Sequence, residues 1–455
     1  HTDSDSATDS DTHTDSDSAT DSDTHTDSDS ESESDTTGCT GTPPSCLQDY
    51  SGLYNSAGCC AAISVAALCP GGVWECPPGY LIDDACQNFA PDCPILPPEG
   101  CGFEYPIFYP AGNNISSVAA GYFNDDSNLD VVAAAIFDNG FTVLTGNGDG
   151  TFNPTTTYVN VGETPSSIKV LDLNDDGYSD VAMTFRDDNN IGLFLGNGDT
   201  TFNTKIAIPT YTDPYDLAIA DINNDNVNDF IVTSNSYDTP RVVVRLAEVS
   251  DGIWNGSFQN IKSTITGLGP TGLATGDFNE DGNVDVAVAC GLENSIDVLF
   301  GRGDGYFNND LSLISGNNPM LVTVTDLDGD DNDDILVGNQ FSDTISIWFG
   351  NGDGTFGFRE DYGTGNGSRA VEVALFNDDN VPDLIVSNWQ DDSLSLLFGT
   401  GVSDLTFTGL DSFYSGDGPS RPIIYDFNND GVPDAVLGSR GEDAIAVMIG
   451  YCEEE

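Results

Sequence analysis

A nine-residue stretch of alternating oxygen-bearing side chains recurs along the chain. In its clearest copy, residues 426–434 read Asp-Phe-Asn-Asn-Asp-Gly-Val-Pro-Asp, so a carboxylate or amide stands at positions 1, 3, 5 and 9. In most copies position 7 offers only its backbone carbonyl. Oxygen ligands at alternate positions, closed by a final Asp, suit a hard cation such as Ca²⁺, which takes about 6–8 oxygens. The stretch therefore predicts a calcium loop.

Five copies of this loop carry a complete set of side-chain ligands. Four have Asp at position 1 and Asn at position 3, and one is all carboxylate. The predicted ligands are Asp172, Asn174, Asp176 and Asp180; Asp221, Asn223, Asp225 and Asp229; Asp277, Asn279, Asp281 and Asp285; Asp326, Asp328, Asp330 and Asp334; and Asp426, Asn428, Asp430 and Asp434. We expect about five bound Ca²⁺ ions. Their removal should destabilise the fold, because clustered carboxylates without a cation repel one another.

Two further copies lack the first ligand, since they carry Tyr122 and Leu375 at position 1. They keep the later positions, which are Asn124, Asp126 and Asp130 in the first loop and Asn377, Asp379 and Asp383 in the sixth. We expect weak metal binding or none in these two loops. Their Asn and Asp side chains can instead hydrogen-bond the turn itself.

The loops recur about every 50 residues from Cys101 onward, a period that indicates a propeller or a solenoid. Each loop ends in an Asp, at positions 130, 180, 229, 285, 334, 383 and 434, which makes seven units. Four short strands can be assigned in each unit; in the second they are residues 167–171, 181–185, 191–195 and a segment from Phe202. No unit has a helical period. This pattern predicts an all-β fold, a seven-bladed β-propeller.

A glycine-rich hairpin is the second signature of the repeat, and it reads Phe-Gly-Asn-Gly-Asp-Gly-Thr-Phe at residues 349–356. Glycine supplies the positive φ values that such turns need. With the Asp-rich loops, these hairpins resemble the FG-GAP or VCBS repeat family, the propeller seen in integrin α-subunits and in a fungal lectin. The resemblance covers about residues 101–452. It implies calcium that holds the blades rigid, with proteins or glycans bound on loops elsewhere.

The seventh unit stops early, because Tyr451, Cys452 and three Glu follow its third strand. Residues 101–109 align with the outer strand at 150–158, so we expect the N-terminal strand to complete the last blade and to remove two free sheet edges. The same alignment places Cys101 and Cys452 in one tight hairpin loop, near enough for a disulfide. Cys290, in an apolar strand, is expected to be a buried and inert thiol.

Two segments precede the propeller, which we assign to residues 101–455. Residues 37–100 hold eight cysteines without Cys-x-x-Cys spacing, which favours a small disulfide-rich module over a zinc site. Residues 1–36 are three copies of an acidic Ser/Thr/Asp repeat of 12 residues without large apolar side chains. Such a tail cannot bury a core. It is either a disordered tail or a stalk that carries O-linked glycans or is held extended by partners.

Charge and sequons point to the outside of the cell. The net charge of −65 repels nucleic acid and anionic membranes, and no transmembrane run or signal peptide is visible. We therefore expect no nucleic-acid binding and no membrane insertion. The chain begins at His1 without Met, so we expect a processed or partial chain. The cysteine density, with N-glycosylation sequons at Asn114, Asn255 and Asn366, favours an extracellular protein that is secreted or part of a cell-surface appendage.

Three functions fit these features. The first is a non-enzymatic adhesive or structural glycoprotein, in its specific form a filament subunit, whose partners are other copies of itself, extracellular proteins or glycans. The alternative is a glycan-binding lectin that stacks sugars on Trp254, Trp348 or Trp389, although strand patterns around these residues favour core packing. The less favoured one is an enzyme acting on polysaccharides or lipids. The propeller region has no His and no nucleophile motif, so we assign no catalytic residue and no organic cofactor.

Overall fold

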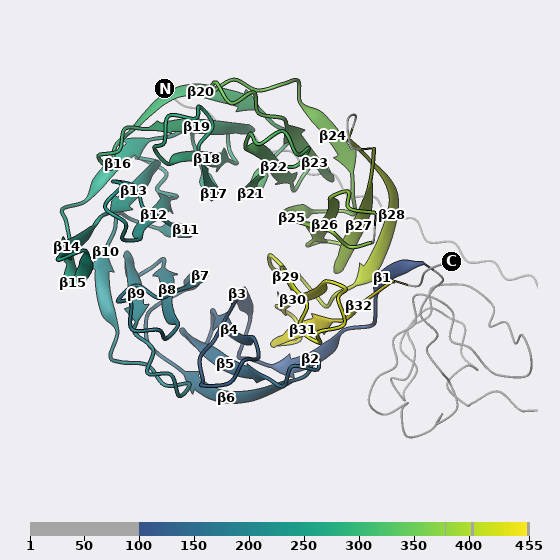
Figure 1. Ribbon diagram of the computed structural model, residues 1–455, viewed down its shortest axis with the longest axis horizontal. Coiled ribbons are helices and arrows are strands. Elements are labelled where there is room, and N and C mark those ends of the chain that lie inside the picture. Colours follow the sequence, from purple (N-terminus) through teal and green to yellow (C-terminus); the bar gives the residue numbers. More distant parts are fainter. Residues whose placement is uncertain (1–99, 378, 402–404, 453–455) are drawn as a thin grey trace, which may run out of the picture.

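The computed structural model describes residues 100–377, 379–401 and 405–452. The expected acidic tail at 1–36 and nearly all of the expected disulfide-rich module at 37–100 lie outside the described residues. Within the described ranges every regular element is a strand, and no helix is present that could span a membrane. Seven four-stranded antiparallel sheets stand around a common centre, as the sequence pattern predicts, with the first strand of each sheet innermost (Figure 1).

The first three blades follow one another along the chain. Blade one contains β3 (Ile115–Gly121), β4 (Asp130–Ala135), β5 (Gly140–Gly146) and β6 (Phe152–Tyr158). Blade two contains β7 (Pro165–Leu171), β8 (Asp180–Phe185), β9 (Asn190–Phe194) and β10 (Ile206–Pro209). Blade three contains β11 (Pro214–Ala220), β12 (Asp229–Ser234), β13 (Arg241–Arg245) and β16 (Lys262–Ile265).

The next three blades repeat this order. Blade four contains β17 (Pro270–Gly276), β18 (Asp285–Cys290), β19 (Ser295–Gly301) and β20 (Phe307–Ile314). Blade five contains β21 (Pro319–Thr325), β22 (Asp334–Asn339), β23 (Thr344–Trp348) and β24 (Glu360–Gly363). Blade six contains β25 (Ser368–Ala374), β26 (Asp383–Asn388), β27 (Ser393–Thr400) and β28 (Thr406–Tyr414).

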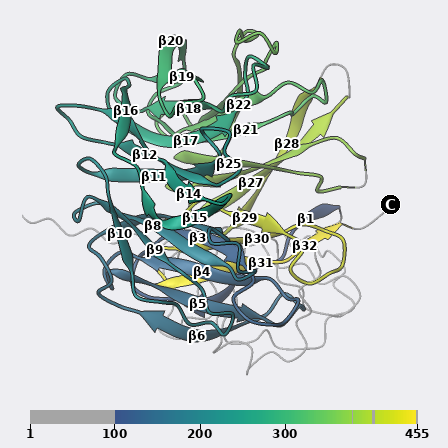
Figure 2. The same ribbon diagram turned by 60° about the vertical axis from the view of Figure 1, so that its left-hand side comes forward.

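Blade seven is built from both ends of the propeller region. Its strands are β29 (Ile423–Tyr425), β30 (Asp434–Ser439), β31 (Ala444–Met448) and, as the outer strand, β2 (Ile107–Pro110). Beside it, β1 (Cys101–Phe103) pairs antiparallel with β32 (Gly450–Cys452), and a disulfide joins Cys101 to Cys452. Figures 1 and 2 both show β1, in blue, next to β32, in yellow. The predicted closure of the ring by its N-terminal strand and by this disulfide is confirmed.

The hydrophobic core lies between neighbouring blades. All six residues of the second strand are buried in each blade, in β4, β8, β12, β18, β22, β26 and β30. Successive side chains of a strand point to opposite faces of its sheet. In β4, Val131 and Ala133 therefore pack against blade seven, whereas Val132 and Ala134 pack against blade two. Unbroken apolar runs of this kind are required because both faces of every blade are covered.

Blade three carries an inserted hairpin between β13 and β16, formed by β14 (Ala247–Ser250) and β15 (Ile253–Phe258). Trp254 on this hairpin is only 8% exposed and packs in the core between blades two and three. Its ring centroid lies 5.5 Å from that of Phe258, and its Nε1 donates a hydrogen bond to the Ser257 carbonyl at 2.9 Å. The insertion therefore extends the interblade core outward.

Candidate metal centre

In every blade the predicted metal loop connects the first strand to the second. In the second loop, Asp172 at position 1 accepts hydrogen bonds from the backbone N–H of Asp176 at 3.2 Å and of Gly177 at 2.8 Å. The first-position carboxylates of the other four complete loops accept from the N–H groups of positions 5 and 6 in the same way. The first Asp thus stabilises the turn of the loop, because its carboxylate accepts hydrogen bonds from backbone N–H groups four and five residues later.

Backbone conformation separates the complete loops from the first, incomplete loop. In the five complete loops positions 4 and 6 both have positive φ, for example 58° at Asp175 and 88° at Gly177. Short polar residues and Gly tolerate this left-handed conformation best. In the first loop, where Tyr122 replaces the Asp, neither Asp125 nor Ser127 has positive φ. A doubly left-handed turn thus accompanies the carboxylate at position 1 in the five complete loops, whereas in the sixth loop, which begins with Leu375, Asn380 at position 6 also has a positive φ of 58°.

The closing Asp at position 9 plays a structural part that the sequence did not distinguish from metal ligation. Asp334 is fully buried, and it accepts hydrogen bonds from Leu327 N and Gly350 N, each at 2.8 Å. The same two hydrogen bonds occur in all seven blades, including those of the incomplete loops that end at Asp130 and Asp383. This carboxylate fastens the metal loop to the end of the third strand.

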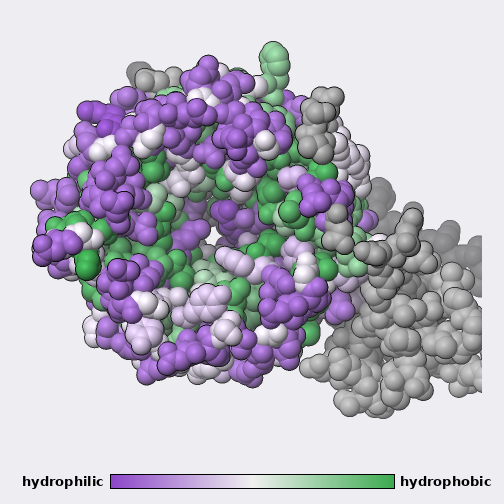
Figure 3. Space-filling view, in the orientation of Figure 1, coloured by the Kyte–Doolittle hydropathy of each residue, from purple (hydrophilic) through white to green (hydrophobic). Residues whose placement is uncertain are grey.

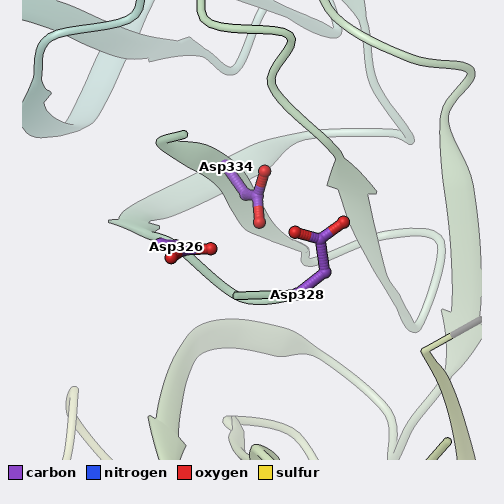
Figure 4. Close-up of side chains that lie close together, drawn as sticks. All are labelled: Asp326, Asp328 and Asp334. Atoms are coloured by element: carbon purple, nitrogen blue, oxygen red, sulfur yellow. The ribbon is translucent and has the colours of Figure 1, made fainter. Parts of the chain in front are cut away.

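Loop five brings three carboxylates together, those of Asp326, Asp328 and Asp334, whose ligand atoms all lie within 4.8 Å of one another. Figure 4 shows the three side chains turned toward a common region, with Asp334 at the start of β22. The fourth predicted ligand, Asp330, accepts instead from Asn332, through its backbone N–H at 2.9 Å and its side-chain amide at 2.8 Å. A donor set made only of carboxylate oxygens fits a hard divalent cation such as Ca²⁺.

The four Asn-containing loops hold their side chains differently. In the second loop the Asn174 amide donates to Asp176 at 2.8 Å, and two more loops repeat this contact. The amide at position 3 therefore moderates the repulsion between carboxylates that the all-Asp loop leaves in place. These loops keep the predicted ligands on one turn, with fewer charges in close contact.

Burial makes the closing carboxylates unfavourable as bare anions. Desolvation raises the pKa of Asp180 and Asp434 to about 6. It also raises the pKa of three others to about 7, namely Asp229, Asp285 and Asp334. Backbone hydrogen bonds oppose this rise in pKa, and the neighbouring loop carboxylates add to it. A bound cation would favour the charged form of these groups.

The remaining predicted residues lie apart from the loops. Asn255 is exposed on the inserted hairpin, and Asn114 is half-buried. Asn366 is exposed, but its amide donates to Asp391 at 2.8 Å. Cys290 is a buried free thiol whose pKa is raised by burial. Of the three tryptophans considered for sugar stacking, Trp254 and Trp348 are buried in the core and Trp389 is 37% exposed.

The fold and the loops together define a class, the seven-bladed β-propeller with an acidic loop in each blade. A family profile described as FG-GAP-like repeat matches residues 122–183, 172–232, 277–337 and 326–386. Each match runs from one acidic loop to the strand after the next loop. The chain belongs to the FG-GAP repeat propeller family, as its loops and hairpins indicated.

Solved structures with the same fold are distant in sequence. The crystal structures of BBS1N in complex with ARL6DN, soaked with lead or with mercury, match with TM-scores of 0.54 and 0.53 at 11% identity, over 77% of this chain and 97% of theirs. A protein from Lactobacillus plantarum matches with a TM-score of 0.50 at 15% identity, over 68% of this chain and 86% of its own. The comparison with curated proteins finds no match. At these identities the similarity shows the fold alone.

Proposed function

We propose that the protein is a calcium-stabilised extracellular module with an adhesive or structural role, and not an enzyme. The observation that carries this proposal is the convergence of the Asp326, Asp328 and Asp334 carboxylates in a loop that recurs in each blade. FG-GAP propellers commonly bind calcium, are often adhesive or structural, and are typically non-catalytic. In this proposal the calcium loops stabilise the propeller and do not catalyse a reaction.

A calcium ion in loop five would be held by Asp326, Asp328 and Asp334, and it would supply the positive charge that offsets their mutual repulsion. The protein's own groups already hold the turn, because Asp326 accepts backbone N–H groups at 2.8, 3.1 and 3.0 Å. The other four complete loops supply an amide and three carboxylates each for further ions. The ions would stiffen the loops that connect the innermost strands to the buried second strands.

Two observations support an extracellular setting. Disulfides persist in oxidising compartments, and the Cys101–Cys452 bond joins the two ends of the ring. The sequon at Asn255 lies exposed on the inserted hairpin, where a glycan would meet solvent. We therefore propose a secreted or cell-surface glycoprotein. Its partners in this proposal are other copies of the chain, as in an extracellular filament, or extracellular proteins and glycans.

The loop carboxylates also argue against the enzymatic alternative, because they already accept hydrogen bonds from N–H groups of their own blade. Asp330 and Asp334 each accept two hydrogen bonds from within the blade. The lectin alternative is weakened because Trp254 and Trp348 are core residues, which leaves Trp389 as the partly exposed ring of the three. A rigid disc with an adhesive or structural role is the simplest remaining function.

Thermal melting with and without calcium tests the first part of the proposal. Calcium should raise the melting temperature and a chelator should lower it. The substitution Asp328→Ala should reduce the calcium-dependent rise, because the Asp328 carboxylate is one of the three that converge in loop five. The matched substitution Asn124→Ala, at the same position of the incomplete first loop, should leave that rise unchanged. A melting temperature that does not respond to calcium would refute the metal assignment.

Imaging of native particles tests the structural role. Electron microscopy of the full-length protein from its natural source should show discs joined end to end or attached to an extracellular surface. Isolated discs at every concentration, together with a monodisperse monomer by light scattering, would contradict the filament form. Turnover of polysaccharides or phospholipids by the pure protein would contradict the non-enzymatic assignment.

A further inference from the structure

A cavity of about 470 Å³ lies at the centre of the ring. Its walls come mainly from the innermost strands of five blades, β3, β7, β11, β25 and β29, with Leu321 of β21. Residues that follow second strands, such as Arg186 and Arg440, complete the lining. Figure 3 shows the face of the disc hollowed at this point. The volume lies within the range of small-molecule sites. The cavity is therefore large enough for a ligand, and it is separate from the acidic loops.

The cavity collects the positive charge of a very acidic chain. The whole chain has 11 Lys and Arg residues against 76 Asp and Glu. Five of these cations line the cavity: Lys169, Arg186, Arg369, Arg421 and Arg440. The carboxylates that line it are two, Asp216 and Glu372. In so acidic a chain, we would expect the few cations to be scattered over the surface and paired with nearby acids. Their gathering in one cavity instead indicates a binding site for a negatively charged ligand.

Two of the five cations are neutralised inside the protein. Arg421 forms an ion pair with Glu372, and Arg186 donates two hydrogen bonds to Asp213, at 2.6 and 3.1 Å. The other lining carboxylate, Asp216, is 7% exposed and accepts hydrogen bonds from Ser167 and from two backbone N–H groups. Within the described ranges Lys169, Arg369 and Arg440 form no ion pair.

Tyr215 lies among three of the guanidinium groups, which come from separate blades. The guanidinium carbon of Arg186 stands 5.1 Å from the centroid of the Tyr215 ring, and Arg369 donates to the Tyr215 hydroxyl at 3.0 Å. The Nε of Arg440 is buried and has no hydrogen-bond partner among the described residues. Burial and, secondly, the charge of Arg369 lower the pKa of Arg440 to about 10. Arg369 and Arg440 therefore repel each other, and neither has an ion-pair partner in the part of the chain that the structure describes.

We propose that the central cavity binds a small oxyanion of the sulfate or phosphate class between Arg369 and Arg440. Guanidinium groups present planar sets of N–H donors that match the oxygens of such anions, and charge-assisted hydrogen bonds are the strong ones. The anion gives the buried Nε of Arg440 an acceptor and screens the two like charges. Lys169 also lies on the cavity wall; it forms no ion pair among the described residues, although the charges of Asp216 and Glu372 act on it. The oxyanion is either a free ion or a group on a sugar that the cavity admits.

Isothermal titration of the calcium-loaded, full-length protein tests this proposal with two probes, inorganic sulfate and a sulfated monosaccharide. Sodium chloride at matched ionic strength corrects for screening. We expect saturable binding to the natural protein and at least about tenfold weaker binding to the double variant Arg369→Gln with Arg440→Gln. The control variant Arg302→Gln changes an exposed guanidinium on the β19–β20 hairpin and should bind like the natural protein.

The two probes distinguish the sources of the oxyanion. Tighter binding of the sulfated sugar identifies a group on a sugar, and equal or weaker binding identifies the free ion; either result supports the site. Without any probe, Arg440→Gln alone should melt no lower than the natural protein, because it removes the repulsion between two guanidiniums and keeps the hydrogen bond from Arg369 to Tyr215. If the double variant does not fold, Arg440→Gln replaces it, since the Arg440 Nε donates no hydrogen bond to the described residues. Absence of binding by both probes, or equal binding to the variant, overturns the proposal.

Discussion

The disulfide between Cys101 and Cys452 should carry a large share of the stability of the ring, and its removal gives the sharpest test of the closure. The perturbation is the double variant Cys101→Ser with Cys452→Ser. Both residues are changed because a single substitution would leave a reactive thiol. A reducing agent is less informative, because the sequence predicts further disulfides among the eight cysteines between residues 39 and 93.

The expected loss follows from the length of the closed loop. The bond spans 351 residues, and the chain-entropy relation gives about 6 kcal/mol at 25 °C for a loop of this length. Unfolding entropy is about 2.1 cal/mol/K per residue, which amounts to about 0.7 kcal/mol/K for a propeller of roughly 350 residues. The ratio of these two values predicts a fall in melting temperature of about 8 °C. The ring should still close, because β2 pairs with β31 over four residues.

Differential scanning calorimetry in the presence of calcium measures this fall. Cys290→Ala is the matched control, since it removes a buried cysteine that forms no disulfide within the described residues. The control should lower the free energy of unfolding by only about 1 kcal/mol, a common cost for a small truncation in a core. If the double variant melts no lower than this control, the cross-link does not stabilise the ring and the entropic argument is wrong.

Three further predictions follow from the loops and the core. Asp383→Ala should cost about 2–5 kcal/mol in urea denaturation with or without calcium, because it leaves two buried N–H donors unpaired; a cost seen only with calcium would contradict this. Calcium-free protein should melt higher at pH 5 than at pH 8, whereas calcium-loaded protein should not. The reason is that three closing carboxylates have a folded pKa of about 7, above the ordinary 3.8, so stability is lost as pH rises through that range. Trp254→Ala should cost about 3–5 kcal/mol and Trp389→Ala under about 1 kcal/mol, and equal losses would disprove the core assignment of Trp254.

The ring closure could be predicted because the repeat fixes its own register. The alignment of residues 101–109 with 150–158 requires Phe103 to stand where Phe152 stands in blade one. In the structure Phe103 pairs with Gly450, and Phe152 pairs with Gly146. Strand pairing depends on local patterns that recur in every unit, so the missing strand of the last blade could be found from the others.

The central cavity could not be predicted in this way. Its cations lie at positions 169, 186, 369, 421 and 440, which belong to three blades. Arg186 and Arg440 both directly follow the second strand of their blades, but the other three share no common place in the repeat. Each one alone resembles an ordinary solvated charge, and no motif spans two of them. Arg369 and Tyr215 meet only because the ring brings blades six and three to a common centre. The amino-acid composition offered one clue. Because the chain has so few basic residues, the position of each Lys or Arg in the fold is informative.

The structural role of the closing Asp could have been predicted from a second pattern in the sequence, the spacing between this Asp and a later Gly. In six blades a Gly follows this Asp by 16 residues and donates to it, as Gly350 does to Asp334. A Cβ on Gly350 would stand 2.3 Å from the Asp333 carbonyl oxygen, so only Gly fits there without a shift of the backbone. Blade three has Ala247 at this place, 18 residues after its Asp, where the inserted hairpin begins.

The seven copies of the loop therefore act as an internal comparison between two roles. The blades whose loops begin with Tyr122 and Leu375 lack the first ligand, yet they keep the closing Asp and both of its hydrogen bonds. Fastening the loop to the third strand thus does not depend on a complete metal site. The residues at positions 1 to 5 add a cation-binding turn to a junction that is already held at position 9. It follows that calcium should govern the rigidity of the five complete loops, while the blades themselves persist without it.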